Sequence, residues 1–198
     1  MNIVLFGDSN TYGYSPEGLR YENRYSNILK NYYDNKINIF EEGLVGRTTI
    51  YDDIRPNRKA LDDIDIILSK YNYIDLLIIM LGTNDYKKKN ARNINDLKYG
   101  MESLLNKINK NRINKILLIS PILLSKNIES LDNEFDYESY LLSLKGSNVY
   151  QELAVNNNFE FLDAKNYATP GSDGEHLTLE GHKNLGNAII EVINNIWK

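Results

Sequence analysis

The chain of 198 residues contains no cysteine and only two histidines. Without cysteine it has no disulfide, no thiol nucleophile and no cysteine ligand for a metal. The two histidines, His176 and His182, leave very few candidates for a catalytic base. His182 falls inside an amphipathic stretch, so we expect a structural or helix-surface role for it and turn to His176 for chemistry.

An excess of positive charge is also missing. The chain has 23 Lys and Arg residues against 27 Asp and Glu residues, a formal net charge of -4. Because nothing in this balance would neutralise phosphates, we expect no nucleic-acid partner. The one basic cluster, Lys87 to Lys89, is interpreted as a solvated loop.

No long apolar segment is present either. No stretch approaches the roughly 18 apolar residues that span a bilayer. Only Met1 and Asn2 precede the first apolar run, which leaves no room for a signal-peptide core. From these absences we expect a cytoplasmic protein with no membrane partner.

What the chain does have is a regular alternation of apolar runs and amphipathic stretches. Its length fits one domain over residues 1–198, and its 42% hydrophobic and 25% charged residues are typical of globular proteins. Apolar spacings of three and four predict helices in which each set faces a core. The expected strands are 3–6, 37–40, 74–81, 116–119 and 159–162, and the expected helical faces are Tyr25, Ile28, Leu29 and Tyr32; Leu61, Ile64 and Leu68; Leu97, Met101, Leu104, Leu105 and Ile108; and Leu185, Ile189, Val192, Ile193 and Ile196.

This alternation predicts an α/β fold with three layers (αβα), in which helices cover both faces of a parallel sheet. The strand order 2-1-3-4-5 is chosen by analogy with flavodoxin-like domains of similar size. Residues 74–81 are apolar apart from Asp75, as expected of a central strand. Thr178 is a candidate N-cap for the last helix. Residues 123–146 are the least regular stretch and are interpreted as a lid, a pocket rim or an oligomer contact.

Polar and glycine residues follow four of the five expected strands. Ser9 follows the first strand, Gly46 the second, Asn84 the third, and Asp173 with His176 the fifth. In an open parallel sheet, ligands bind beyond the carboxyl ends of the strands, so these residues would converge. Taken singly, each has a more ordinary interpretation as a helix cap, a turn glycine or an Asx turn.

Together these residues supply the parts of an acyl-transfer site. A serine hydroxyl needs a base that removes its proton, and a carboxylate three positions before His176 can orient the imidazole. The developing oxyanion needs donors, and the N–H groups of Ser9 and Gly46 and the Asn84 amide are candidates.

Four motifs in this order resemble the SGNH hydrolases, also called the GDSL esterase and lipase superfamily. They are residues 7–11 (GDSNT), 43–49 (GLVGRTT), 82–85 (GTND) and 173–176 (DGEH). The resemblance implies Ser9 as nucleophile, His176 as base, Asp173 as the orienting acid, and Ser9, Gly46 and Asn84 as the oxyanion hole. It implies that Asp8 braces its loop, that the substrate is a small-molecule ester, and that neither a cofactor nor a metal takes part.

Residues 41–49 and 78–85 are similar to the arylesterase and acyltransferase branch of that superfamily. Members of the branch cleave small acyl esters, some transfer the acyl group to alcohols, and some are homo-oligomers. Asn10 departs from the leucine common after the nucleophile, which could alter the acyl pocket or the preference for transfer. A carbohydrate O-acetylesterase with the same triad is the alternative within this chemistry. A non-catalytic flavodoxin-like anion or nucleotide binder, with a phosphate loop at residues 7–13, is the alternative outside it; the charge of Asp8 speaks against it.

Overall fold

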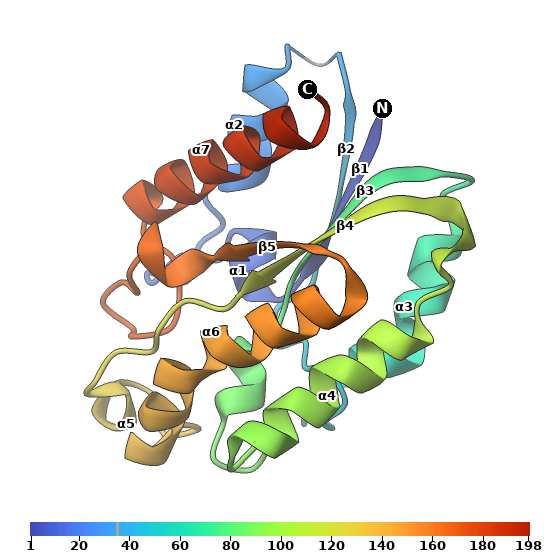
Figure 1. Cartoon of the computed structure of the whole chain (residues 1–198). Coiled ribbons are helices and arrows are strands. Elements are labelled where there is room, and N and C mark those ends of the chain that lie inside the picture. Colours follow the sequence, from blue (N-terminus) through green and yellow to red (C-terminus); the bar gives the residue numbers. More distant parts are fainter. Residues whose placement is uncertain (35) are drawn as a thin grey trace.

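Five parallel strands form one sheet in the order β2-β1-β3-β4-β5 in a computed structural model that describes residues 1–34 and 36–198 (Figure 1). The predicted fold class and strand order are confirmed. The strands are β1 (Asn2–Gly7), β2 (Asn38–Gly43), β3 (Ile74–Met80), β4 (Ile113–Ser120) and β5 (Glu160–Asp163). The largest boundary errors were at the end of β2 and the start of β4. At both places, polar residues extend the strand beyond its apolar run, so the apolar pattern does not show them. Lys115, for example, pairs with Leu76 in the sheet.

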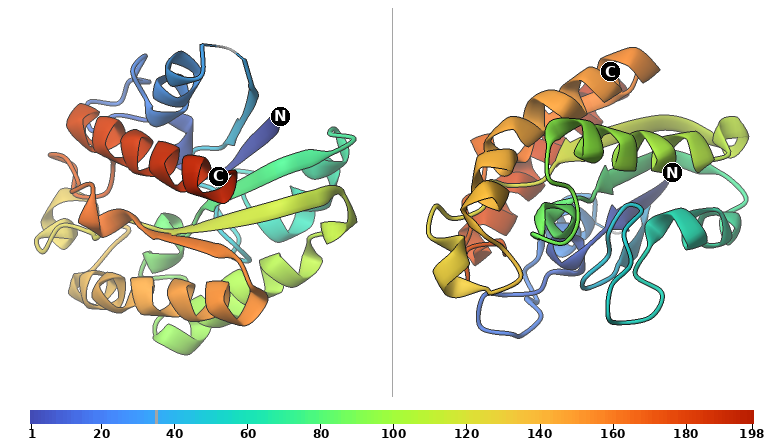
Figure 2. Two further views of the ribbon diagram at one scale, coloured as in Figure 1. Left: turned by 45° about the horizontal axis from the view of Figure 1, so that its top comes forward. Right: turned by 90° about the horizontal axis from the view of Figure 1, so that it is seen from below.

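Helices cover both faces of the sheet (Figure 2). Helices α2 (Tyr25–Tyr32) and α7 (Leu179–Ile196) pack together over one face, and α3 (Ala60–Ser69), α4 (Ile94–Lys107) and α6 (Tyr137–Asn157) cover the other. As predicted, the side chain of Thr178 caps α7 by accepting the Gly181 N–H. The described helices include none that is long and apolar enough to cross a bilayer. The short helices are α1 (Ser9–Tyr12), α5 (Ile128–Leu131), η1 (Thr83–Tyr86), η2 (Lys110–Arg112) and η3 (Ala164–Asn166).

Two apolar cores lie on either side of the sheet and hold its central strands rigid. In β1, Val4 and Phe6 enter one core and Ile3 and Leu5 the other, and β3 alternates in the same way. All of these side chains are removed from solvent, which is why β1 and β3 read as continuous apolar runs. The loops that leave the carboxyl ends of β1 and β3 therefore start from fixed points.

The region from residue 123 to 146 is more regular than its sequence indicated. It contains α5 and the first half of α6, a helix of 21 residues that the apolar spacing did not predict. The buried face of α6 includes Ser139, Ser143, Gly146 and Ser147, so its inward side carries little apolar contrast. Because serine and glycine interrupt the apolar residues on this face, the apolar stripe that would reveal the helix is broken.

The interpretation of Lys87 as part of a solvated loop was wrong. Its side chain is only 3% exposed and forms an ion pair with Glu134. The partner lies 47 residues away in sequence, on the segment before α6. Lys88 and Lys89 are, by contrast, on the surface.

Candidate active site

Ser9 begins helix α1, two residues after the end of strand β1. Asp8 caps this helix: its Oδ1 accepts the Asn10 N–H at 3.0 Å and its Oδ2 accepts the Thr83 N–H at 3.3 Å. The expected bracing role of Asp8 is confirmed by these two bonds. Gly7 leaves no room for a side chain, since an added Cβ would lie 2.1 Å from the Met80 carbonyl oxygen. The close approach of Gly7 to β3 and the two hydrogen bonds of Asp8 therefore hold the backbone that carries Ser9.

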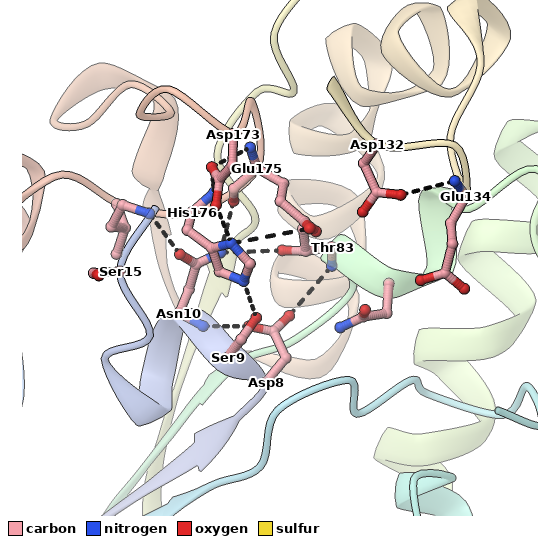
Figure 3. Close-up of polar contacts among 12 residues, drawn as sticks. Asp8, Ser9, Asn10, Ser15, Thr83, Asp132, Glu134, Asp173, Glu175 and His176 are labelled. Atoms are coloured by element: carbon pink, nitrogen blue, oxygen red, sulfur yellow. Dashed lines mark hydrogen bonds and ion pairs between the residues drawn. The ribbon is translucent and has the colours of Figure 1, made fainter. Parts of the chain in front are cut away.

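His176 and Asp173 come from the segment between β5 and α7 and meet Ser9 at the carboxyl edge of the sheet (Figure 3). The His176 Nε2 lies 2.9 Å from Ser9 Oγ, and its Nδ1 lies 2.6 Å from Asp173 Oδ2. Because a carboxylate accepts at Nδ1, the Nε2 lone pair faces the serine hydroxyl. Asp173 Oδ1 also accepts the backbone N–H groups of Glu175 and His176, at 3.2 and 3.1 Å. Asp173 therefore caps its own turn and orients the imidazole.

The charges around His176 favour its protonated form. Burial lowers the pKa of His176, but the hydrogen bond to Asp173 and the charges of Glu175 and Asp173 outweigh this, so the pKa lies above 6.5. Burial also acts on Asp173, yet the hydrogen bonds from His176 hold the pKa of that carboxyl below 3.8. An imidazolium that forms during a reaction would thus be stabilised in place.

Three potential oxyanion donors lie on three different segments: Ser9 at the start of α1, Gly46 on the loop after β2, and Asn84 in η1. In residues 1–34 and 36–198, neither the Ser9 N–H nor the Gly46 N–H donates a hydrogen bond within the protein. The Asn84 amide donates one of its two hydrogens to the Arg47 carbonyl at 3.1 Å, which leaves the second available. Gly46 has a φ of +78°, a conformation that favours glycine. The residues predicted as an oxyanion hole thus keep donors that the fold itself does not consume.

Buried polar contacts tie the loop after β2 to the loop after β3. Asp85 accepts both the N–H and the hydroxyl of Thr49, at 2.9 and 2.5 Å. The Arg47 guanidinium donates to the Gly7 carbonyl at 2.9 Å and lies 4.3 Å from the centroid of the Phe6 ring. Since buried groups bonded in this way resist displacement, the three loops form one rigid frame.

The sequence interpretation missed several charged residues beside this frame. Glu175 Oε1 lies 3.9 Å from His176 Nδ1, and burial raises the pKa of Glu175 to about 7. The Arg55 guanidinium packs directly against Gly46, because an added Cβ there would lie 2.0 Å from Arg55 Nη2. The buried carboxylate of Asp53 holds Arg55 through a 2.8 Å hydrogen bond to Nε. Glu175 had a signal in the sequence as the neighbour of His176, whereas Arg55 had none.

His182 lies outside this constellation, as expected; of the two roles considered for it, the structural one is confirmed and the helix-surface one is wrong. It is fully buried in α7, and its Nδ1 accepts the Tyr25 N–H at 3.3 Å. Burial lowers its pKa to about 4, so it is neutral. The described residues contain no cluster of three or more His, Asp or Glu side chains that could hold a metal ion. A phosphate loop at residues 7–13 is also disfavoured, since the Asp8 carboxylate already occupies the Asn10 N–H.

Comparisons with known proteins agree with this arrangement. The profile of the family described as GDSL-like Lipase/Acylhydrolase matches residues 3–189. The solved structure of a carbohydrate acetylesterase from Sinorhizobium meliloti is similar with 29% sequence identity and a TM-score of 0.88, covering 99% of both chains. The aryl esterase of M. smegmatis is similar with 28% identity and a TM-score of 0.87, covering 98% of both chains. No curated protein matches the chain.

The family match extends over all four motifs, and the similar structures cover nearly the whole chain. The predicted resemblance to SGNH hydrolases is confirmed, as is the prediction of an enzyme that acts on small-molecule esters. This chain belongs to the GDSL-like lipase/acylhydrolase family and is a serine-dependent carboxylic ester hydrolase with the SGNH fold.

Proposed function

We propose that Ser9 attacks the carbonyl of a small acyl ester while His176 removes its proton, and that Asp173 orients the imidazole. The proton passes from Ser9 Oγ to Nε2 and then to the leaving alcohol, which leaves an acyl group on Ser9. Water, deprotonated by the same nitrogen, then hydrolyses this acyl-enzyme. The observation that carries the proposal is the chain of contacts from Ser9 Oγ to Nε2 at 2.9 Å and from Nδ1 to Asp173 at 2.6 Å.

We also propose that the Ser9 N–H, the Gly46 N–H and the Asn84 side chain bind the tetrahedral oxyanion. Their unused hydrogens and their attachment to one braced frame support this role. Donors fixed before the reaction stabilise a developing charge without reorganising, which is where such sites gain most of their rate.

The proposed roles are tested by labelling. The purified protein is expected to hydrolyse p-nitrophenyl acetate and to lose this activity on reaction with a fluorophosphonate. Mass spectrometry of the digested protein should then find the label on the peptide that contains Ser9. If activity were lost with the label on another residue and not on Ser9, the assignment of the nucleophile would be refuted.

The pH dependence of kcat/KM should report the proposed base. Only neutral His176 can accept a proton, and its pKa lies above 6.5. We therefore expect kcat/KM to rise with pH and to reach half its plateau above pH 6.5.

Glu175→Gln should move this midpoint to lower pH. With a pKa of about 7, the Glu175 carboxyl is partly ionised in the range where His176 titrates. The substitution removes this partial negative charge, which raises the pKa of His176, so the imidazole stays neutral to a lower pH. Glu191→Gln, the same change at an exposed position of α7, is the control and should leave the midpoint in place. A midpoint that shifts equally in both variants would exclude a specific effect of Glu175.

Asn84→Ala should lower kcat about 10²- to 10³-fold, the range found when one oxyanion donor is removed. KM should change little, because the carbonyl oxygen gains its charge only after binding. Thermal unfolding of the variant checks that loss of the bond to the Arg47 carbonyl does not unfold the loop. A kcat within about threefold of the wild-type value would remove Asn84 from the oxyanion hole.

A carbohydrate O-acetylesterase is the second candidate. The polar side chains of Glu175 and Arg55 beside His176 and Gly46 favour it, because hydroxyl-rich alcohols can hydrogen bond to both. The similar structure from S. meliloti is of a carbohydrate acetylesterase. Rates on acetylated sugars and on aryl acetates, each measured with and without an added alcohol as acceptor, would separate this activity from arylesterase activity and from acyl transfer.

A further inference from the structure

Asn10, the residue after Ser9, is fully buried and contacts the segment that carries His176. Its Oδ1 accepts the Leu177 N–H at 2.8 Å, and its Nδ2 donates to the Glu175 carbonyl at 3.2 Å. Its own N–H is held by Asp8. One amide side chain therefore bonds to both neighbours of His176, across 165 to 167 residues of sequence. Figure 3 shows Asn10 beside Ser9, below the His176 segment.

The two peptide groups that flank His176 have four polar atoms, and each has a partner. The His176 N–H donates to Asp173 Oδ1 at 3.1 Å, and the His176 carbonyl accepts the Gly171 N–H at 2.8 Å. Both of these partners belong to the same segment as His176. The other two atoms, the Glu175 carbonyl and the Leu177 N–H, bond to Asn10. Asn10 is thus the partner that ties this backbone to the loop of Ser9.

Resting on the proposed function, we propose that Asn10 is a positioning residue that sets the 2.9 Å contact between Ser9 Oγ and His176 Nε2. A misplacement of about 1 Å between reacting groups can cost about 10²-fold in rate, so this link is expected to act on kcat. A leucine at position 10 has a similar shape but neither donates nor accepts. It would leave the Glu175 carbonyl and the Leu177 N–H buried without partners, and the segment would shift to satisfy them.

The experiment compares Asn10→Leu with Tyr25→Phe as a matched control. Tyr25→Phe deletes another buried hydrogen bond of α1, from the Tyr25 hydroxyl to Thr11 Oγ1, that does not touch the His176 segment. For Asn10→Leu, kcat on p-nitrophenyl acetate should fall about 10- to 100-fold while KM stays within about threefold. Tyr25→Phe should keep the wild-type kcat. Should Asn10→Leu not fold, Asn10→Ala removes the same amide without added bulk and carries the same expectation.

Nuclear magnetic resonance of ¹⁵N-histidine tests the link without turnover, since the chain has only two imidazole rings. In the wild type, the Nδ1 proton of His176 should be downfield and slow to exchange with water. In Asn10→Leu it should exchange faster or disappear, while the His182 signals stay unchanged. A wild-type kcat together with unchanged His176 signals would overturn the positioning role. A wild-type protein without esterase activity would instead refute the proposed function, and the His176 signals would still decide the role of Asn10.

Discussion

Ser9→Ala is expected to lower kcat on p-nitrophenyl acetate by about 10⁴- to 10⁶-fold, to a residual rate that does not need the nucleophile. The substitution removes the atom that forms the acyl-enzyme and leaves the proposed oxyanion donors in place. Even the Ser9 N–H remains, because it belongs to the backbone. KM should stay near the wild-type value, since the hydroxyl contributes little to binding before attack.

Stability separates this loss from a folding defect. Among residues 1–34 and 36–198, the one hydrogen-bond partner of Ser9 Oγ is His176, so Ser9→Ala should keep the melting temperature within a few degrees of the wild-type value. Ser26→Ala is the matched control, because Ser26 is buried like Ser9 and its hydroxyl has no hydrogen-bond partner in the described residues. It should retain full activity. Turnover by Ser9→Ala at the wild-type rate would place the nucleophile elsewhere.

The fold could be predicted where burial and periodicity coincide. Strands β1 and β3 are buried on both faces, so their apolar runs were found within one residue at each end. Helix α7 buries an apolar stripe and was found together with its cap. Helix α6 was not found because serine and glycine fill part of its contact face. The burial of Lys87 was missed because its partner in the ion pair, Glu134, is distant in sequence and is brought close only by the tertiary structure.

The site was predictable to the extent that strand ends determine it. Ser9, Gly46 and Asn84 each follow a strand of the parallel sheet. Because β2, β1 and β3 are neighbours that run in the same direction, these three residues lie at one edge. The residues around the site could not be predicted, because their roles depend on the directions of side chains, which the sequence does not give. The Arg55 guanidinium packs against Gly46 and donates a hydrogen bond to Asp53, two contacts that only the tertiary structure shows. Asn10 seemed a candidate for the acyl pocket, but its side chain is fully buried and points at the backbone on either side of His176.

Asp173→Asn is the second large effect, expected to lower kcat by about 10⁴-fold with little change in shape. The amide oxygen can still accept the N–H groups of Glu175 and His176, as Asp173 Oδ1 does. The amide nitrogen, however, replaces the acceptor 2.6 Å from His176 Nδ1. A donor in that place forces Nδ1 to accept, so the ring proton moves to Nε2. The imidazole then presents a proton to Ser9 where the reaction needs a lone pair, and the imidazolium loses its counter-charge.

Two measurements distinguish this tautomer effect from a loss of structure. The ¹⁵N shifts of His176 should show the proton on Nδ1 in the wild type and on Nε2 in Asp173→Asn, at a pH where the ring is neutral. Asp173→Ala also removes the acceptor of the two backbone N–H groups, so it should melt at a lower temperature than Asp173→Asn. If Asp173→Asn kept kcat within about tenfold of the wild-type value, the carboxylate would act only as a cap of its turn, and orientation of His176 would rest on the backbone contacts around it.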